Sequence, residues 1–260
     1  MKLATFNVNS INARLPRILA WFDDAKPDAV VLQEIKCVDE KFPADAFEER
    51  GYNVAVHGQK TYNGVALLSK HPIDDVTRGL PGDDADAQAR YIEALICPDD
   101  AEPVRLCGLY LPNGNPAPGP KYDYKLAWMR RLKARAQTLL ADEEAFILAG
   151  DFNVIPQAED VHDPAAWADD ALFRAETRAL FRELVNLGLT EAVRALHPQA
   201  VLYTFWDYQR GAWEKDHGIR IDHHLLSPQA ADRLKAAGVD RAERGREKPS
   251  DHVPVWIELD

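Results

Sequence analysis

The chain has 260 residues, of which 46% are hydrophobic and 28% charged, and its formal net charge is −11 at pH 7. These values are ordinary for a soluble globular protein and allow one large α/β or two-sheet domain. Taken alone, the acidic total argues against nucleic acid as a partner, but local charge decides binding, and carboxylates at a metal site lower the sum.

The cysteines and the hydropathy pattern narrow the cellular setting. Cys37, Cys97 and Cys107 are an odd number without paired spacing, which indicates free thiols and neither a disulfide framework nor a zinc site. No apolar run approaches the roughly 20 residues of a membrane span, and the first residues are strand-like instead of forming a basic and apolar leader. We therefore expect a soluble, cytoplasmic protein.

The N-terminal segment predicts a strand, a helix and a second strand. Residues 3–8 form the first apolar run, residues 15–25 have helical spacing of apolar side chains, and residues 29–32 form the second run. A unit of this length is typical of a crossover between parallel strands, whose polar ends lie at the same edge. Asn7 and Glu34 are therefore expected near each other.

The next segment predicts more strands and one long helix. Residues 52–57 and 64–69 are expected to form a hairpin, residues 71–88 a loop, and residues 90–97 and 104–111 two strands, the second ending in Tyr110. An irregular loop at 112–116 precedes a helix over about 121–141, the most basic part of the chain. Such a basic face is usually solvated; a phosphate contact is most credible for Lys121, beside the loop.

Residues 146–153 carry the most informative pattern. A short apolar run is broken by Gly150, and Asp151 and Asn153 follow on alternate positions, so both polar side chains leave the strand end on one face. A carboxylate beside an amide suits a metal-bound phosphate. For these residues alone, an Asx-type turn is the more common explanation.

The C-terminal part predicts helices near 171–187 and 190–196 and strands at 203–206, 219–227 and 253–259. Asp222 lies in the second of these strands, and Asp251-His252 precedes the last. No low-complexity linker or defensible repeat divides the chain, so residues 1–260 are interpreted as one domain.

Polar residues thus recur where predicted strands end. Singly each has a structural explanation: a cap, a surface carboxylate, a wetted core tyrosine or a local ion pair. Together they supply acidic ligands for a hard divalent cation, amides for phosphate oxygens, and a histidine with carboxylate partners, which suits hydrolysis of a phosphodiester. These residues are Asn7, Glu34, Tyr110, Asp151, Asn153, Asp222, Asp251 and His252.

With these residues in place, the chain resembles the exonuclease III and abasic-site endonuclease family of the endonuclease/exonuclease/phosphatase superfamily. The matching segments follow the family order and span nearly the whole chain. They are Phe-Asn-Val-Asn at 6–9, Leu-Gln-Glu-Ile-Lys at 32–36, Gly-Val-Ala-Leu-Leu-Ser at 64–69, Gly-Asp-Phe-Asn at 150–153, Arg-Ile-Asp at 220–222 and Lys-Pro-Ser-Asp-His-Val-Pro-Val at 248–255.

The resemblance implies a four-layer α/β sandwich of two packed, mostly antiparallel sheets flanked by helices, with the site at one edge. It implies Mg²⁺, or Mn²⁺ in its place, held chiefly by Glu34 with Asp251 and Asn7 close by. Asp151 would activate water or protonate the leaving group, alternatives that the family leaves open. Asn153 would bind the phosphate, Tyr110 would orient it, and His252, held by Asp222, would contact it.

The resemblance also implies the substrate. The expected partner is double-stranded DNA with abasic sites or with blocked or recessed 3′ ends, bound by a monomer. The expected reactions are 3′→5′ exonuclease action, incision 5′ to abasic sites and release of 3′ phosphates. Phe205, Trp206, Ile219 and Ile221 match the apolar pocket wall, although core packing is expected for one of the two aromatic residues. Arg90, Asn113 and Lys121 follow the DNA-acting branch.

Three alternatives stay open at this stage. A superfamily phosphatase acting on a small phosphorylated molecule would agree with the net charge of −11. A secreted DNase of the same fold would have a leader and disulfides. A non-catalytic DNA-binding relative would have lost a ligand, whereas every expected catalytic position is filled.

Overall fold

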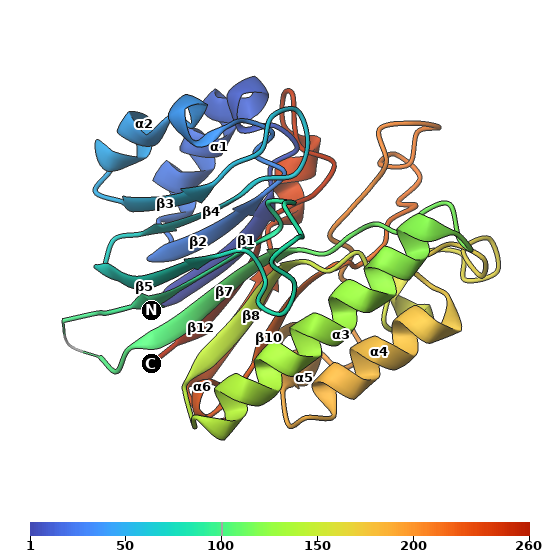
Figure 1. Cartoon of the computed structure of the whole chain (residues 1–260). Helices are drawn as coiled ribbons and strands as arrows, with labels where there is room; N and C mark the ends of the chain where they lie inside the picture. Colours follow the sequence, from blue (N-terminus) through green and yellow to red (C-terminus); the bar gives the residue numbers. More distant parts are fainter. Residues whose placement is uncertain (100) are drawn as a thin grey trace.

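The computed structural model, which describes residues 1–99 and 101–260, contains two six-stranded sheets packed face to face with helices on their outer faces (Figure 1). The strands are β1 (Lys2–Asn7), β2 (Ala29–Gln33), β3 (Asn53–His57), β4 (Val65–Ser69), β5 (Ile73–Arg78), β6 (Tyr91–Ile96), β7 (Val104–Tyr110), β8 (Phe146–Asp151), β9 (Thr190–Glu191), β10 (Asp222–Leu226), β11 (Leu234–Val239) and β12 (Val255–Leu259). The α-helices are α1 (Ile11–Ala25), α2 (Ala44–Glu48), α3 (Pro120–Ala141), α4 (Ala175–Val185), α5 (Ala192–Leu196) and α6 (Pro228–Ala231).

Both sheets are built around one parallel pair of strands. Their orders are β11-β12-β1-β2-β4-β3 and β5-β6-β7-β8-β10-β9. β1 and β2 are parallel and are joined through α1, while β7 and β8 are parallel and are joined through α3; the other pairs are antiparallel. This confirms the expected sandwich of two mostly antiparallel sheets, and also the strand–helix–strand unit at the N-terminus.

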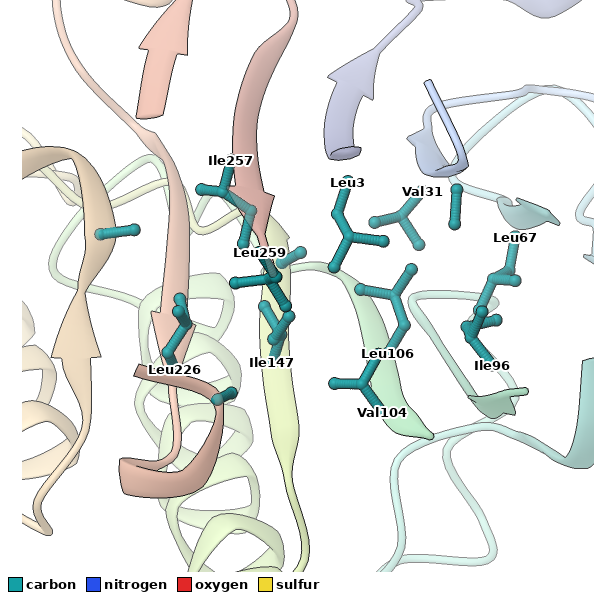
Figure 2. Packing of buried hydrophobic residues seen from close by; sticks show 14 of the residues in the cluster. Leu3, Val31, Leu67, Ile96, Val104, Leu106, Ile147, Leu226, Ile257 and Leu259 are labelled. Carbon is teal, nitrogen blue, oxygen red and sulfur yellow. The ribbon is translucent and has the colours of Figure 1, made fainter. Parts of the chain in front are cut away.

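The space between the sheets is filled by aliphatic side chains. Leu3, Val31 and Ile257 from one sheet face Leu106 and Ile147 from the other, and all five are completely buried (Figure 2). The strands at the centre of each sheet are apolar on both faces, because helices cover their outer faces. Removing this much apolar surface from water is the main term that favours the folded chain.

Several segments differ from the sequence-based expectations, and three of these differences concern strands of four or more residues. The predicted loop at 71–88 contains β5, an edge strand. Its two adjacent aspartates are exposed and interrupt the alternation of polar and apolar residues by which a strand is predicted. The predicted strand at 203–206 is an irregular segment that makes only isolated bridges from Phe205 to Ile219 and to His252. The edge strand β11 was not predicted, since its sequence is short in β-branched residues.

The topology brings several strand ends to one edge of the sandwich. β1, β2, β7 and β8 end there, and β10, which is antiparallel to β8, begins there with Asp222 opposite Asp151. Gly150 permits the close approach of the neighbouring strand, because a Cβ at this position would lie 1.9 Å from the carbonyl oxygen of Leu109. Within the described residues, no helix combines the length and the apolar character needed to span a bilayer.

Candidate active site

A cavity of about 250 Å³ opens at this edge, and most of the polar residues predicted from the sequence line it. Its walls come from seven segments that are distant in the chain, which explains why no single motif predicts it. The lining residues are Glu34, Tyr110, Asn113, Asn115, Asp151, Asn153, Trp167, Asp170, Leu172, Phe205, Asp207, Ile219, Ile221, Asp251 and His252.

Asn7 forms hydrogen bonds with two carboxylates, one at the end of each sheet's parallel strand pair. Its side-chain amide donates to Glu34 Oε1 at 2.9 Å and to Asp151 Oδ2 at 3.0 Å, and the residue is completely buried. Glu34 directly follows β2 in a left-handed conformation, with φ of 51°, which turns its side chain across the strand ends. The predicted proximity of Asn7 and Glu34 is therefore confirmed.

Lys36 sets the charge state of Glu34. Its ammonium lies 2.8 Å from Glu34 Oε2. Burial by itself would raise the pKa of Glu34, but the hydrogen bond and positive charge of Lys36 outweigh it and lower the pKa below its usual value. Glu34 is thus an ionised carboxylate at neutral pH.

His252 lies between two buried carboxylates. Its Nδ1 is 2.9 Å from Asp222 Oδ2, which also accepts a 2.6 Å hydrogen bond from the Thr204 hydroxyl, and its Nε2 is 3.7 Å from Asp151 Oδ2. Burial disfavours the charged ring, but the charges of Asp222 and Asp151 dominate and raise the pKa of His252 to about 10. The ring is therefore a cation that can donate a hydrogen bond into the cavity.

Asp151 has a pKa well above the usual value for an aspartate. Burial and the nearby charge of Asp222 raise its pKa to about 7, although His252 opposes the shift. The backbone N–H of Asn153 donates to Asp151 Oδ1 at 2.8 Å and fixes the carboxylate. A buried carboxyl group that titrates near neutrality is suited to general acid–base catalysis.

A buried lysine connects the turn after β8 to the loop after β7. Lys125 Nζ donates to the carbonyl oxygens of Asn153 at 2.6 Å and Pro112 at 3.0 Å, and burial lowers its pKa to about 7. Asn153 in turn donates to Leu111 O at 2.9 Å and accepts a hydrogen bond from Asn113 at 3.3 Å. These contacts fix two amide side chains at the cavity.

Tyr110 ends β7 directly opposite Asp151. The guanidinium of Arg90 stacks on its ring, 4.8 Å from the centroid, and Arg90 also donates to the Tyr110 carbonyl oxygen at 3.2 Å. Burial and the charges of Glu34 and Asp151 raise the pKa of the Tyr110 hydroxyl well above its usual value, so it stays protonated as a donor.

The donor set suits a hard divalent cation. One ligand atom from each of Glu34, Asp151 and His252 lies within 4.8 Å of the others, the one such cluster in the part of the chain that the structure describes. A protonated His252 has no lone pair to offer, so a cation at this position would be held by the carboxylates. Asp251 also lines the cavity, but its Oδ1 accepts a hydrogen bond from Asn9 at 3.1 Å, and it lies outside the cluster of three.

Three residues expected at the pocket do not line the cavity: Trp206, Lys121 and Arg90, whose guanidinium stacks on the ring of Tyr110. Trp206 is completely buried, with its Nε1 bonded to Asp216 Oδ1 at 2.9 Å, whereas Phe205, Ile219 and Ile221 line the cavity. Trp206 is therefore a core residue, as expected for one of the two aromatics. Lys121 is exposed in the first turn of α3 and does not line the cavity.

Sequence reasoning missed several residues that support the cavity. Lys125 belongs to the predicted basic helix over 121–141, whose charged face is expected to be solvated, but its spacing from Met129 and Leu132 places it on the buried stripe. Asn115 and Asp170 form a hydrogen-bonded pair at 3.1 Å, and Trp167 and Asp207 line the cavity from irregular segments. For these last four residues the sequence has no periodic signal.

The fold and the site together define a hydrolase of phosphate esters: carboxylates for a divalent cation, a charged histidine and a titrating aspartate converge at the edge of a two-sheet sandwich. The chain belongs to the Endonuclease/Exonuclease/phosphatase family, whose sequence profile matches residues 4–252, and within it to the branch of exonuclease III and the abasic-site endonucleases.

Individual relatives match along their whole length. An exodeoxyribonuclease III from Haemophilus influenzae is 34% identical over 270 residues, covering 100% of both chains. The structure of an AP endonuclease from Archaeoglobus fulgidus superimposes with a TM-score of 0.94 at 36% identity, covering 100% of this chain and 99% of that one. A 3′ phosphatase from Neisseria, solved with a product DNA hairpin, gives a TM-score of 0.95 at 39% identity, with 100% and 99% covered.

Proposed function

We propose that the chain is a divalent-metal-dependent DNA-repair phosphodiesterase. It removes nucleotides 3′→5′ from duplex ends, cuts 5′ to abasic sites and releases 3′-terminal phosphates. The observation that carries this proposal is the convergence of Asn7, Glu34, Asp151 and the Asp222–His252 pair at one cavity walled by Phe205 and Ile219.

The cation is Mg²⁺, with Mn²⁺ as a substitute. Glu34 and Asp151 are its carboxylate donors, and Asn7, Asn153 and Asp251 lie around them as amide or outer ligands. When bound, the cation neutralises charge on the phosphate and on the leaving oxygen.

The protein residues bind the phosphate and move the proton. His252, fixed through Nδ1 by Asp222, donates from Nε2 to a phosphate oxygen. Asn153 and Tyr110 donate to the same group and set its orientation. Asp151, with its pKa near neutrality, either accepts the proton of the attacking water or gives one to the leaving oxygen.

The apolar wall accounts for selection of abasic nucleotides. Phe205, Ile219 and Ile221 form a wall against which a deoxyribose without a base can be turned out of the duplex at low cost. Arg90, Lys121 and Asn113 contact the DNA around the cavity, with Lys121 placed by the exposed first turn of α3. The protein acts as a monomer.

The test uses purified protein with a labelled duplex that carries one abasic-site analogue, beside an intact duplex with a recessed 3′ end. Each substrate is run with Mg²⁺, with Mn²⁺ and with EDTA. We expect metal-dependent cutting immediately 5′ to the lesion and stepwise shortening of the recessed strand. Binding without cutting under every metal condition would overturn the catalytic assignment.

The second candidate is a phosphatase for small phosphorylated molecules, which the net charge of −11 favours. In that case neither duplex would be bound or cut, while metal-dependent release of inorganic phosphate from sugar phosphates or nucleotides would be measured.

A further inference from the structure

A second cavity, of about 480 Å³, adjoins the catalytic cavity, and we call it the side pocket. The two cavities share four lining residues: Trp167, Phe205, Asp207 and Ile219. The side pocket is additionally lined by His162, Ala166, Gln209, Arg210, Ala212 and His217. A group that enters the catalytic cavity past Phe205 and Ile219 therefore has further space beside it.

Flat aromatic surfaces form one part of the side pocket. The rings of His162 and His217 stack with centroids 4.6 Å apart and an interplanar angle of 6°, and Trp167 meets His162 edge-on at 6.4 Å. Backbone contacts hold the stack, because His162 N donates to Gly218 O at 3.1 Å and His217 N to Ala212 O at 2.8 Å. Preformed aromatic surfaces of this kind bind nucleobases by stacking.

Polar groups complete the lining. Arg210 and Gln209 can donate hydrogen bonds and Asp207 can accept them. His162 Nδ1 is 3.3 Å from the Gly218 carbonyl oxygen, which can only accept, so Nδ1 carries the proton and Nε2 is left for another partner. The volume is within the about 300–1,000 Å³ that is usual for small-ligand sites. An aromatic pocket with a few polar groups is complementary to a nucleobase, whose faces are apolar and whose edges are polar.

We propose that the side pocket is a nucleobase site that holds the base of the nucleotide on the 3′ side of the scissile phosphate. The inference rests on the proposed function and names the substrate class that needs this pocket: duplex ends whose terminal nucleotide still carries its base. In that hydrolysis, water oxygen bonds to phosphorus, the bond to the 3′ oxygen of the preceding nucleotide breaks, and that oxygen receives a proton. The products are a 5′-mononucleotide and a shortened strand with a 3′ hydroxyl.

Three substrates test whether the side pocket binds a base, because they differ only in the groups on the 3′ side of the scissile phosphate. A 3′-phosphate end has neither sugar nor base there, an abasic analogue has a sugar alone, and an ordinary 3′ nucleotide has both. Only the last places a base in the side pocket. The measured quantity is the rate on the base-bearing end divided by the rate of 3′-phosphate release, for the same protein.

The first variant is Ala166→Phe, which fills the side pocket from an exposed position that does not line the catalytic cavity. Its matched control is Ala165→Phe, at the neighbouring exposed residue, which lines neither cavity. His162→Ala, which removes half of the stack, is the second variant. We expect Ala166→Phe and His162→Ala to lower the ratio at least about 5-fold, the lower end of what stacking of one base on an aromatic side chain contributes, and Ala165→Phe to keep the wild-type ratio.

The failures are distinguishable. If Ala166→Phe and His162→Ala keep the wild-type ratio, or lower the rates on all three substrates equally, the base does not occupy the side pocket and the inference is wrong. If the wild-type protein cuts none of the three substrates, the proposed function itself fails. Circular dichroism of each variant separates a folding defect from either result.

Discussion

The orientation of His252 follows from contacts of single atoms. Asp222 Oδ2 accepts hydrogen bonds from both the Thr204 hydroxyl and His252 Nδ1, so the imidazole ring has one orientation, and Nε2 faces Asp151 and the cavity. Without the negative charges of Asp222 and Asp151, burial would favour a neutral ring. The charge of His252 is thus produced by its neighbours and not by its residue type.

Asp151→Asn tests the proposed role of Asp151 in proton transfer. Asparagine preserves size and can still accept the hydrogen bond from Asn153 N, but it cannot exchange a proton in catalysis. We expect turnover to fall at least about 100-fold while duplex affinity changes little. Single-turnover cleavage and equilibrium binding on the same abasic duplex are the measurements, and near-normal turnover would exclude this role for Asp151.

Glu34→Ala tests the proposed role of Glu34 as a metal donor. Its carboxylate is ionised and directed at the cluster with Asp151, so its loss weakens cation binding more than DNA binding. The Mg²⁺ concentration for half-maximal cleavage should rise at least about 10-fold. Glu40→Ala removes an exposed carboxylate six residues further along the chain and is the matched control. The same metal dependence in both variants would contradict the assignment.

On the scale of an element, α3 shows how burial distinguishes two lysines of one helix. Lys121 is exposed in the first turn, whereas Lys125, one turn later, is completely buried and bonds two carbonyl oxygens of the cavity loops. The basic composition of the helix conceals this difference, and only the spacing along the apolar stripe indicates it.

Lys125→Met tests the structural part of that role. Methionine fills similar space but leaves the carbonyl oxygens of Pro112 and Asn153 without this donor, so we expect a loss of about 1–3 kcal/mol in the free energy of unfolding. The rate of cleavage should fall as well, since Asn153 and Asn113 lose their support. Urea unfolding measures the first effect. Lys121→Met should keep the free energy of unfolding within about 0.5 kcal/mol of the wild-type value. An equal loss in both variants would contradict the structural role assigned to Lys125.

Strand β10 contains a histidine that opposes folding. His224 is completely buried, neither ring nitrogen has a hydrogen-bond partner among the described residues, and burial lowers its pKa to about 3. Its pKa in the unfolded chain is near 6.5, so below that pH the unfolded state takes up a proton that the folded state refuses. Stability attributable to His224 therefore falls as pH drops below about 6.5.

His224→Leu removes both unfavourable features of the buried histidine, its ring nitrogens without hydrogen-bond partners and its lowered pKa. We expect a gain of about 1–3 kcal/mol in the free energy of unfolding at pH 7, and a smaller loss of stability between pH 7 and pH 5 than in the wild type. Urea unfolding at the two pH values gives both numbers. His71→Gln, which removes a half-buried histidine from the bend before β5, is the comparison variant and should preserve the wild-type pH dependence. If the His224→Leu variant is less stable than the wild type and has the same pH dependence, the ring nitrogens of His224 have hydrogen-bond partners in solution and the prediction is wrong.

At the scale of the whole molecule, the cavity exists because two sheets pack closely. Gly108 of β7 faces Val31 of β2 across the sandwich, and a Cβ at Gly108 would lie 2.1 Å from Val31 Cγ1. The same two sheets carry Glu34 and Asp151, so their spacing also sets the distance between the carboxylates.

Gly108→Ala should therefore lower the free energy of unfolding by about 1–3 kcal/mol through overpacking. Adding Val31→Ala should recover part of that loss, with a coupling above about 0.5 kcal/mol in a double-mutant cycle. Val30 lies on the opposite face of β2, so Val30→Ala should give no recovery and is the control. Simple additivity in both pairs would argue against contact-limited packing.

Local sequence patterns predict much of this architecture. The parallel β1–β2 unit, the β3–β4 hairpin and the long helix α3 have the apolar periodicities that their elements require, and the structure contains all three. The edge strand β5 and the irregular segment at 203–206 were interpreted wrongly. In both, contacts from distant residues decide the backbone: β5 pairs on one side only, and Phe205 bridges to Ile219 and His252.

The sequence by itself determined which groups stand at the ends of strands, and their chemistry was enough to indicate phosphate ester hydrolysis. It could not determine that Phe205 faces the cavity while Trp206 is core, that Lys125 is the buried lysine, or that Asp151 titrates near neutrality. Local periodicity depends on a residue and its neighbours in the chain, whereas burial, charge state and cavity shape depend on segments that only the packed sheets bring together.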